Sequence, residues 1–209
     1  METKSNYLFL IFDLETNGIG YFNPPTQRPI QISYQLINCE CDIIDNKTYF
    51  ISGVKKIKWP ETFKKCPWSV EEINKKGISK KSLQTKLTKI FINNDKSNSI
   101  VLVGHNIDFD FGCLCNFIND EQFTKLFKKH KKICTMKSTT NFCKLSYPNS
   151  NNSLNKNSIK KYKWPKLSEL ANKLEIKIDE DKFHDSKYDV EITKQCFVKL
   201  KDKYIKKLG

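Results

Sequence analysis

Two acidic side chains stand at the end of an apolar run near the start of the chain. Residues 7–12 are rich in aromatic and branched side chains and too few to span a membrane, so they predict a strand buried on both faces. Residues two apart in a strand share a side, so Asp13 and Glu15 should project together from its C-terminal end. Like charges this close favour a bound cation, although a strand that surfaces into a turn at Asn17-Gly18 would look the same.

A second polar group follows residues 100–103, a short apolar run that fits a central parallel strand. His105 and Asn106 close this strand, and Asp110 lies in the helical pattern behind them. Asp108 is a rival acid on the same stretch. This group, like the first, lies where a strand is expected to meet a helix.

A third polar group, His184 with Asp189, precedes and begins the expected last helix at 186–204. Taken alone, it also fits an ordinary helix start. Asp185 or Ser186 would then be the N-cap, and Asp189 would be an acid in the first turn that the helix dipole stabilises. His184 would be a plain loop histidine.

Alternating strand-like and helix-like stretches indicate an α/β domain. Strands are expected at 7–12, 30–38, 41–52, 100–103 and 133–135, with the first three forming an antiparallel meander. Helices are expected at 69–75, 79–91, 123–130, 136–143, 166–174 and 186–204, and another carries Asp110. The length of 209 residues fits one domain, 1–209, with a mobile Asn-, Ser- and Lys-rich loop at about 146–163.

The chain is strongly basic, with 37 Lys and Arg against 23 Asp and Glu and a net charge of +14. A polyanion such as nucleic acid is the natural partner, and the alternative is a merely well-solvated surface. Arg28 is the single arginine, and the abundance of Lys, Asn and Ile is typical of an AT-rich coding genome. The excess of charge is therefore informative, whereas the choice of lysine is not.

The sequence also bears on the compartment. No segment reads as a membrane span, and the first residues lack the basic start of a secretory signal, so neither secretion nor a membrane partner is expected. The eight cysteines include no Cys-x-x-Cys pair and are expected to be free thiols. His130, within a run of lysines, is expected to be solvated. These features favour an intracellular protein, cytoplasmic or nuclear, or in the host cytoplasm if viral.

The three polar groups occur in the order and at the intervals of a known family. The chain resembles the DEDDh (DnaQ-like) 3′-to-5′ exonucleases of the ribonuclease H-like superfamily over nearly its whole length. Residues 12–16 (FDLET) are similar to the family's first motif, 105–110 (HNIDFD) to its second and 184–189 (HDSKYD) to its third. The stretch 164–167 (WPKL) is similar to one in viral and phage members. The resemblance implies a ribonuclease H-like α/β fold with a mixed, roughly five-stranded sheet flanked by helices.

The resemblance also implies a site for two Mg²⁺ or Mn²⁺ ions. Hard oxygen ligands suit these ions, and two of them roughly 4 Å apart can activate water and offset charge on a phosphodiester. His184 is then the general base that takes the proton of the attacking water. Asp110 is preferred to Asp108 because the family's ligand directly follows an aromatic residue, here Phe109. The implied metal ligands are Asp13, Glu15, Asp110 and Asp189.

Some substrate contacts are implied at the turn after the first motif. Thr16, Asn17 and Gly18 would hold the 3′-terminal nucleotide, partly through their backbone. An apolar side chain wedges the terminal base in this family, and the candidates here are Ile19, Tyr21 and Phe22.

Other contacts are expected further along the chain. His105 and Asn106 should shape the loop of the second motif and touch the substrate. Trp164 and Lys166 combine a ring with a charge, which suits the bases and phosphates of a single strand, although a plain helix start is the equal alternative.

The expected activity is removal of nucleoside 5′-monophosphates from single-stranded or frayed 3′ ends of DNA, in proofreading, repair or end trimming. The first alternative is an RNA exonuclease of the ribonuclease T or oligoribonuclease kind, because the motifs do not report on the 2′-hydroxyl. The second alternative is a basic nucleic-acid-binding module without catalysis. The presence of all five implied catalytic residues favours an enzyme.

Overall fold

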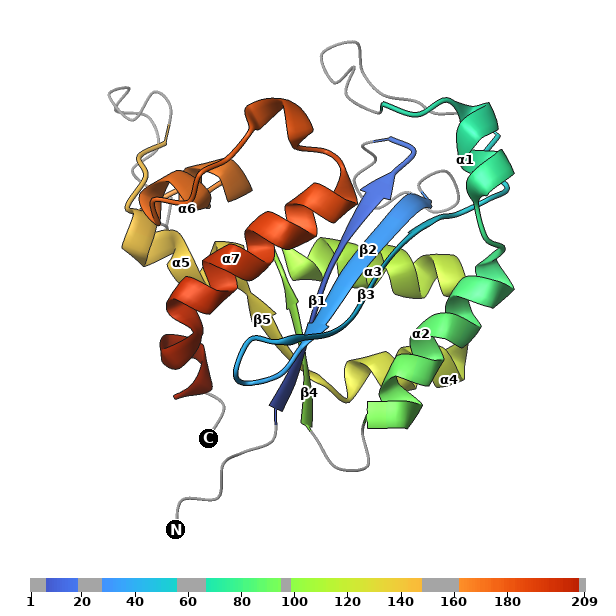
Figure 1. The fold of residues 1–209 in the computed structure, drawn as a ribbon, viewed down its shortest axis with the longest axis horizontal. Coiled ribbons are helices and arrows are strands. Elements are labelled where there is room, and N and C mark those ends of the chain that lie inside the picture. Colours follow the sequence, from blue (N-terminus) through green and yellow to red (C-terminus); the bar gives the residue numbers. More distant parts are fainter. Residues whose placement is uncertain (1–6, 19–27, 56–66, 95–98, 148–161, 207–209) are drawn as a thin grey trace, which may run out of the picture.

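The computed structural model describes residues 7–18, 28–55, 67–94, 99–147 and 162–206. One mixed five-stranded sheet in the order β3-β2-β1-β4-β5 forms the centre, and helices lie on both of its faces (Figure 1). The strands are β1 (Tyr7–Thr16), β2 (Pro29–Ile37), β3 (Ile43–Phe50), β4 (Ser99–Gly104) and β5 (Lys131–Cys134). The expected α/β class and mixed five-stranded sheet are confirmed.

Strand β1 lies in the middle of the sheet because neither of its faces is polar until its end. Its even-numbered side chains from Leu8 to Leu14 pack into one core cluster, and Phe9 and Ile11 pack into another on the opposite face. The alternation of a strand therefore places Asp13 and Glu15 on the side of Phe9 and Ile11. The strand runs to Thr16, beyond the expected end at residue 12, so both acids belong to the strand itself.

Strand directions bring the polar groups to one edge. β2 pairs antiparallel with β1 and β3, and β4 pairs parallel with β1 and β5. In the β1–β2 register, Asp13 lies opposite Ser33 and Glu15 lies opposite Gln31. Because β1 and β4 are parallel, the residues that follow Gly104 emerge at the same edge as the two acids.

The helices form a layer on each side of the sheet (Figure 1). The side of Leu10 and Phe12 is covered by α2 (Lys80–Asn94), α3 (Ile107–Ile118) and α4 (Glu121–Lys128). The side of Phe9 and Ile11 is covered by α7 (Ser186–Ile205). The remaining helices are α1 (Val70–Lys76), α5 (Thr135–Cys143), α6 (Leu167–Lys173) and the 3₁₀ turn η2 (Glu180–Lys182).

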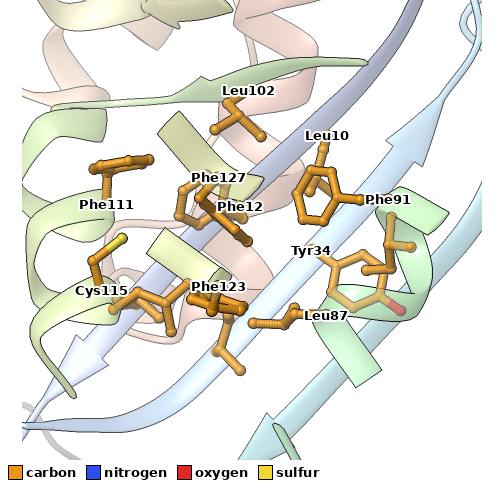
Figure 2. Packing of buried hydrophobic residues seen from close by; sticks show 14 of the residues in the cluster. Leu10, Phe12, Tyr34, Leu87, Phe91, Leu102, Phe111, Cys115, Phe123 and Phe127 are labelled. Atoms are coloured by element: carbon orange, nitrogen blue, oxygen red, sulfur yellow. The ribbon is translucent and has the colours of Figure 1, made fainter. Parts of the chain in front are cut away.

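Aromatic rings fill the core on the α2–α4 side (Figure 2). The Phe127 ring centroid lies 4.8 Å from that of Phe91 and 4.7 Å from that of Phe123, and the ring meets Phe12 edge-on. His130 stacks on Phe91 with 4.7 Å between centroids and is buried, so the expectation of a solvated His130 is wrong. The lysines beside it are exposed, whereas the turn that ends α4 directs this one ring inward.

Local signals that the sequence carries are confirmed at the helix ends. The Glu72 amide donates to Ser69 Oγ at 3.1 Å, and the Ser69 amide donates to Glu72 Oε2 at 2.9 Å, which is the capping box expected at the start of α1. The cysteines of the described ranges are free thiols. Most of the expected loop at 146–163 falls on residues 148–161, outside the described ranges. Within the described residues, no helix combines the length and apolarity that crossing a membrane requires.

Candidate active site

Three carboxylates meet at the C-terminal end of β1. Asp13 and Glu15 come from the strand, and Asp189 comes from the first turn of α7. One oxygen of each lies within 4.8 Å of the other two. They meet because α7 packs on the face of β1 that carries both acids. This trio is called the carboxylate cluster below.

Asp110 reaches the same strand end from α3, in the other helix layer. Its Oδ1 accepts a hydrogen bond from the backbone amide of Leu14 at 3.2 Å, and the residue is only 3 % exposed. Its negative charge raises the pKa of both Asp13 and Glu15, so it lies within electrostatic reach of the cluster. The structure therefore brings all four implied metal ligands to one strand end.

Asp108, the rival of Asp110, is directed elsewhere. Its two oxygens contact Lys132 Nζ at 2.8 Å and Lys137 Nζ at 2.6 Å. Hydrogen bonds from these two lysines lower the pKa of Asp108, which is exposed. Of the two acids in this helical turn, Asp110 is buried at the end of β1, whereas Asp108 is exposed and paired with lysines.

The carboxylates repel one another when no cation is bound. Burial, together with repulsion from Asp110 and Asp189, raises the pKa of Asp13 and of Glu15 well above the ordinary range. Burial likewise raises the pKa of Asp110 to about 8 and that of Asp189 to about 7. Asp189 Oδ1 is buried and meets no hydrogen-bond donor within the part of the chain that the structure describes. Desolvated oxygens that lack a counter-charge fit a hard divalent cation such as Mg²⁺ or Mn²⁺.

His184 lies beside this cluster, in the loop between η2 and α7. Its backbone is left-handed, with φ of 69°, and the residue is exposed. Its amide donates to Asp189 Oδ2 at 3.2 Å. The histidine is therefore fixed to one carboxylate through its backbone, while its side chain remains accessible from solvent.

The turn after β1 is closed by local hydrogen bonds. Thr16 Oγ1 donates to the carbonyl of Gly18 at 2.9 Å. The Asn17 amide donates to the Arg28 carbonyl at 3.0 Å, and the Arg28 amide donates to Asn17 Oδ1 at 2.8 Å. The three residues expected to hold a terminal nucleotide are thus tied to the start of β2. The candidate wedge residues Ile19, Tyr21 and Phe22 lie outside the described ranges.

His105 links the loop of the second motif to its neighbours. Its Nε2 lies 3.0 Å from the carbonyl of Pro165 and its Nδ1 lies 3.0 Å from Thr135 Oγ1. A carbonyl can only accept, so Nε2 carries the proton and Nδ1 accepts from the hydroxyl. Burial lowers the pKa of His105 to about 4, so the ring is neutral and shapes the loop. Asn106, with φ of 73°, then begins α3.

The contact between His105 and Pro165 places Trp164 and Lys166 near the second motif. The Trp164 side chain is 45 % exposed, and Lys137 Nζ lies 5.8 Å from the centre of its ring. Lys166 is exposed, and its amide donates to Glu169 Oε2 at 2.8 Å at the start of α6. A ring and cations therefore do share this surface, as a single-strand contact would require.

Sequence reasoning missed two residues that the structure connects to the site. Arg28 holds the turn after β1, and Gln31, opposite Glu15, holds the start of α7. The available signals were the singularity of Arg28 among the basic residues and the alternation of Gln31, Ser33 and Gln35 with apolar residues in β2. Such alternation marks a polar strip on one face of a buried strand.

No protein-family model matches the sequence, and no similar curated protein is found. Among solved structures, product-bound exonuclease I is similar, with a TM-score of 0.64 and 15 % identity over 96 % of this chain and 44 % of that chain. E. coli exonuclease I in complex with a dA16 oligonucleotide has a TM-score of 0.64 and 16 % identity over 95 % and 41 %. The chain thus spans less than half the length of these enzymes. Identity this low shows the fold alone, which is the α/β, ribonuclease H-like fold of exonuclease I.

Proposed function

We propose that the protein is a metal-dependent 3′-to-5′ exonuclease of the DEDDh type. Its proposed substrate is the single-stranded or frayed 3′ end of DNA, from which it releases nucleoside 5′-monophosphates in proofreading, repair or end trimming. The observation that carries the proposal is the meeting of Asp13, Glu15 and Asp189 within 4.8 Å, with Asp110 behind them. The solved exonuclease I complexes with dA16 and dT13 oligonucleotides favour DNA over RNA.

Four carboxylates would hold the ions of this site. Asp13, Glu15, Asp110 and Asp189 offer hard oxygens, and Asp189 Oδ1 is buried without a hydrogen-bond partner among the described residues. Two bound Mg²⁺ or Mn²⁺ ions would supply an activated water and offset the charge that develops on the phosphate.

Other residues of the chain would accept the proton and hold the substrate. A ring nitrogen of His184 would accept the proton of the attacking water, for which an imidazole with an unperturbed pKa of about 6.5 is suited. The turn at 16–18 would hold the terminal nucleotide, because it adjoins the carboxylate cluster directly in β1. Trp164 and Lys166 would contact the strand behind that nucleotide through stacking and charge.

A stepwise degradation assay tests this function. With 3′ ends free and the 5′ end labelled, single-stranded DNA should shorten one nucleotide at a time in Mg²⁺ or Mn²⁺, and Asp13→Ala should abolish the shortening. Asp108→Ala is the matched control, since it removes an exposed carboxylate that points away from the cluster. If the protein binds DNA but does not shorten it in the presence of metal, the exonuclease proposal is wrong and a non-catalytic nucleic-acid-binding module is supported.

The choice of nucleic acid needs a parallel measurement. DNA and RNA oligomers of one sequence, compared by kcat/KM under identical conditions, should show the DNA to be the better substrate. A clear preference for RNA would replace the substrate in this proposal while keeping its chemistry, because the same carboxylates serve either backbone.

A further inference from the structure

Gln31 connects β2 to the start of α7 with both ends of its amide. Its Oε1 accepts from the Ser186 amide at 3.0 Å and from Ser186 Oγ at 2.9 Å. Its Nε2 donates to Asp185 Oδ1 at 3.1 Å. The side chain is 2 % exposed, so these bonds form in a site where an unpaired amide would be costly.

The two segments that Gln31 joins are the two halves of the candidate site. On its own side, it lies opposite Glu15 in the β1–β2 register. On the other side, Asp185 and Ser186 stand between His184 and Asp189 in the chain. One buried amide therefore fixes the distance between a carboxylate of β1 and the segment that carries the third motif.

Neighbouring hydroxyls extend this connection across β2. Ser33 Oγ lies 2.8 Å from Ser186 Oγ and 2.8 Å from Thr48 Oγ1 of β3. Asp185 Oδ1 also accepts from the Lys187 amide at 3.0 Å, which makes Asp185 the N-cap of α7. The Asp185 carboxylate is thus committed to capping through one oxygen.

Apolar contacts alone would leave α7 less well placed. Val190 and Phe197 bury against the sheet, but such contacts are non-directional and tolerate small rotations or shifts along the helix axis. Hydrogen bonds to the first residues of α7 depend on distance and angle. They fix the helix start to within a fraction of an ångström, which is the tolerance that metal ligands require.

We propose that Gln31 is a positioning residue for the site: by fixing the start of α7 it sets where Asp189 and His184 stand relative to Asp13 and Glu15. Its effect on catalysis rests on the proposed function, whereas its effect on metal binding does not. Removing a partner that orients metal ligands typically lowers metal affinity or activity by about 10- to 100-fold.

The test compares Gln31→Met with Gln35→Met. Gln35 lies on the same face of β2, and its Nε2 donates to Glu191 Oε2 of α7 at 3.0 Å, but Glu191 lies in the second turn of the helix and this bond does not hold the helix start at Asp185 and Ser186. Each variant loses a side-chain amide between β2 and α7, buried at Gln31 and half-buried at Gln35, while methionine keeps the length of the side chain. They therefore share a loss of stability and differ in whether the helix start is released.

Mn²⁺ binding, followed by electron paramagnetic resonance of the free ion, is the first readout. Gln31→Met should bind Mn²⁺ about tenfold more weakly than Gln35→Met. On end-labelled DNA it should lose about tenfold in kcat with KM little changed. Equal Mn²⁺ affinity in the two variants would overturn the inference, even if the wild-type protein cut no nucleic acid. Absence of nuclease activity in the wild-type protein would instead overturn the proposed function and leave the inference about metal binding testable.

Ser186→Ala covers the case in which Gln31→Met fails to fold. It removes the hydroxyl contacts with Gln31 Oε1 and Ser33 Oγ and leaves the bond from the Ser186 amide to Gln31 in place. A smaller weakening of Mn²⁺ binding in the same direction is expected, and an unchanged titration would count against the positioning role.

Discussion

Among single residues, His184 contacts the cluster through its backbone amide, which donates to Asp189 Oδ2, so its side chain can be removed without breaking that bond. His184→Ala should reduce kcat by about 10²-fold or more, since general-base catalysis contributes on this scale. DNA affinity, measured in Ca²⁺ to suppress cleavage, should stay near the wild-type value. Lys182→Ala, at the end of η2 just before this loop, is the control. A loss of affinity with kcat preserved would reassign His184 to substrate binding.

Asp110 makes the metal-free protein sensitive to pH. The pKa of Asp110 is raised to about 8 and that of Asp189 to about 7, whereas a carboxyl in the unfolded chain titrates near pH 4. Between about pH 4 and pH 8 the folded state therefore binds more protons than the unfolded state, and the free energy of unfolding falls as pH rises. The melting temperature without metal should decrease over this range, and Mg²⁺ or Mn²⁺ should restore it at the upper end.

Asp110→Asn tests the cause of this slope. The amide keeps an oxygen for the Leu14 amide and removes one negative charge, so the metal-free variant should melt higher than wild type at pH 8. A gain of roughly 1 kcal/mol would appear as about 2–4 °C. Thermal scans in a chelator measure it, and the same variant should lack nuclease activity. Identical pH slopes in both proteins would contradict the raised pKa assigned to Asp110.

The candidate site shows what single residues reveal in sequence. Asp13, Glu15, Asp110, His184 and Asp189 carry chemistry by their type, and all are found at one strand end. Gln31 carries none by its type, and only the register of β2 against β1 and the packing of α7 give it a role. Those depend on contacts between residues about 150 positions apart, which no local pattern encodes.

At the scale of elements, Arg28, the residue just before β2, contacts three neighbouring segments. The Arg28 guanidinium donates to the carbonyls of Ser52 and Gly53, and its carbon lies 4.9 Å from the centre of the Phe117 ring. Its backbone closes the turn at Asn17. The planar guanidinium makes the two carbonyl hydrogen bonds and the ring contact at once, which a lysine ammonium does not.

Arg28→Lys should therefore destabilise the protein although the charge is kept. We expect a loss of roughly 1.5–3 kcal/mol in the free energy of unfolding, the range for hydrogen bonds to charged groups, and a higher KM for DNA because the turn after β1 loosens. Urea unfolding and steady-state kinetics measure the two effects. Lys80→Ala, which removes another cation over the Phe117 ring at 5.7 Å, should change little. An unchanged unfolding midpoint in Arg28→Lys would contradict the role of the guanidinium.

The presence of helices and strands was easier to predict than the residues at which they begin and end. Apolar runs and caps identify β1, β4, α1 and α7, because burial and capping act over a few residues. The apolar run alone predicts an end of β1 at residue 12, whereas the strand continues through both acids to Thr16. In the structure, pairing with β2 continues through Glu15, and antiparallel hydrogen bonds carry the strand past the point where its side chains become polar.

At the scale of the whole molecule, the chain has a net charge of +14 although its candidate site consists of carboxylates. Affinity for single-stranded DNA should fall steeply with salt, with a slope of about −0.7 in log K against log salt for each phosphate contacted. Fluorescence anisotropy between low and moderate salt measures it. Affinity that does not change with salt would exclude broad contact with phosphates and restrict recognition to the strand end.

The assembly of the site from both ends of the sequence also has a consequence for folding. The β1–β2–β3 meander uses neighbours in the chain, whereas β1 meets β4 through pairs such as Tyr7 with Ser99, and Asp13 meets Asp189 only through α7. Contacts between distant residues are slow to form. A chain emerging from the ribosome therefore carries Asp13 and Glu15 early but completes the carboxylate cluster only once α7 has docked. Metal binding at the cluster should thus report a finished fold, because an incomplete chain lacks the third carboxylate, Asp189.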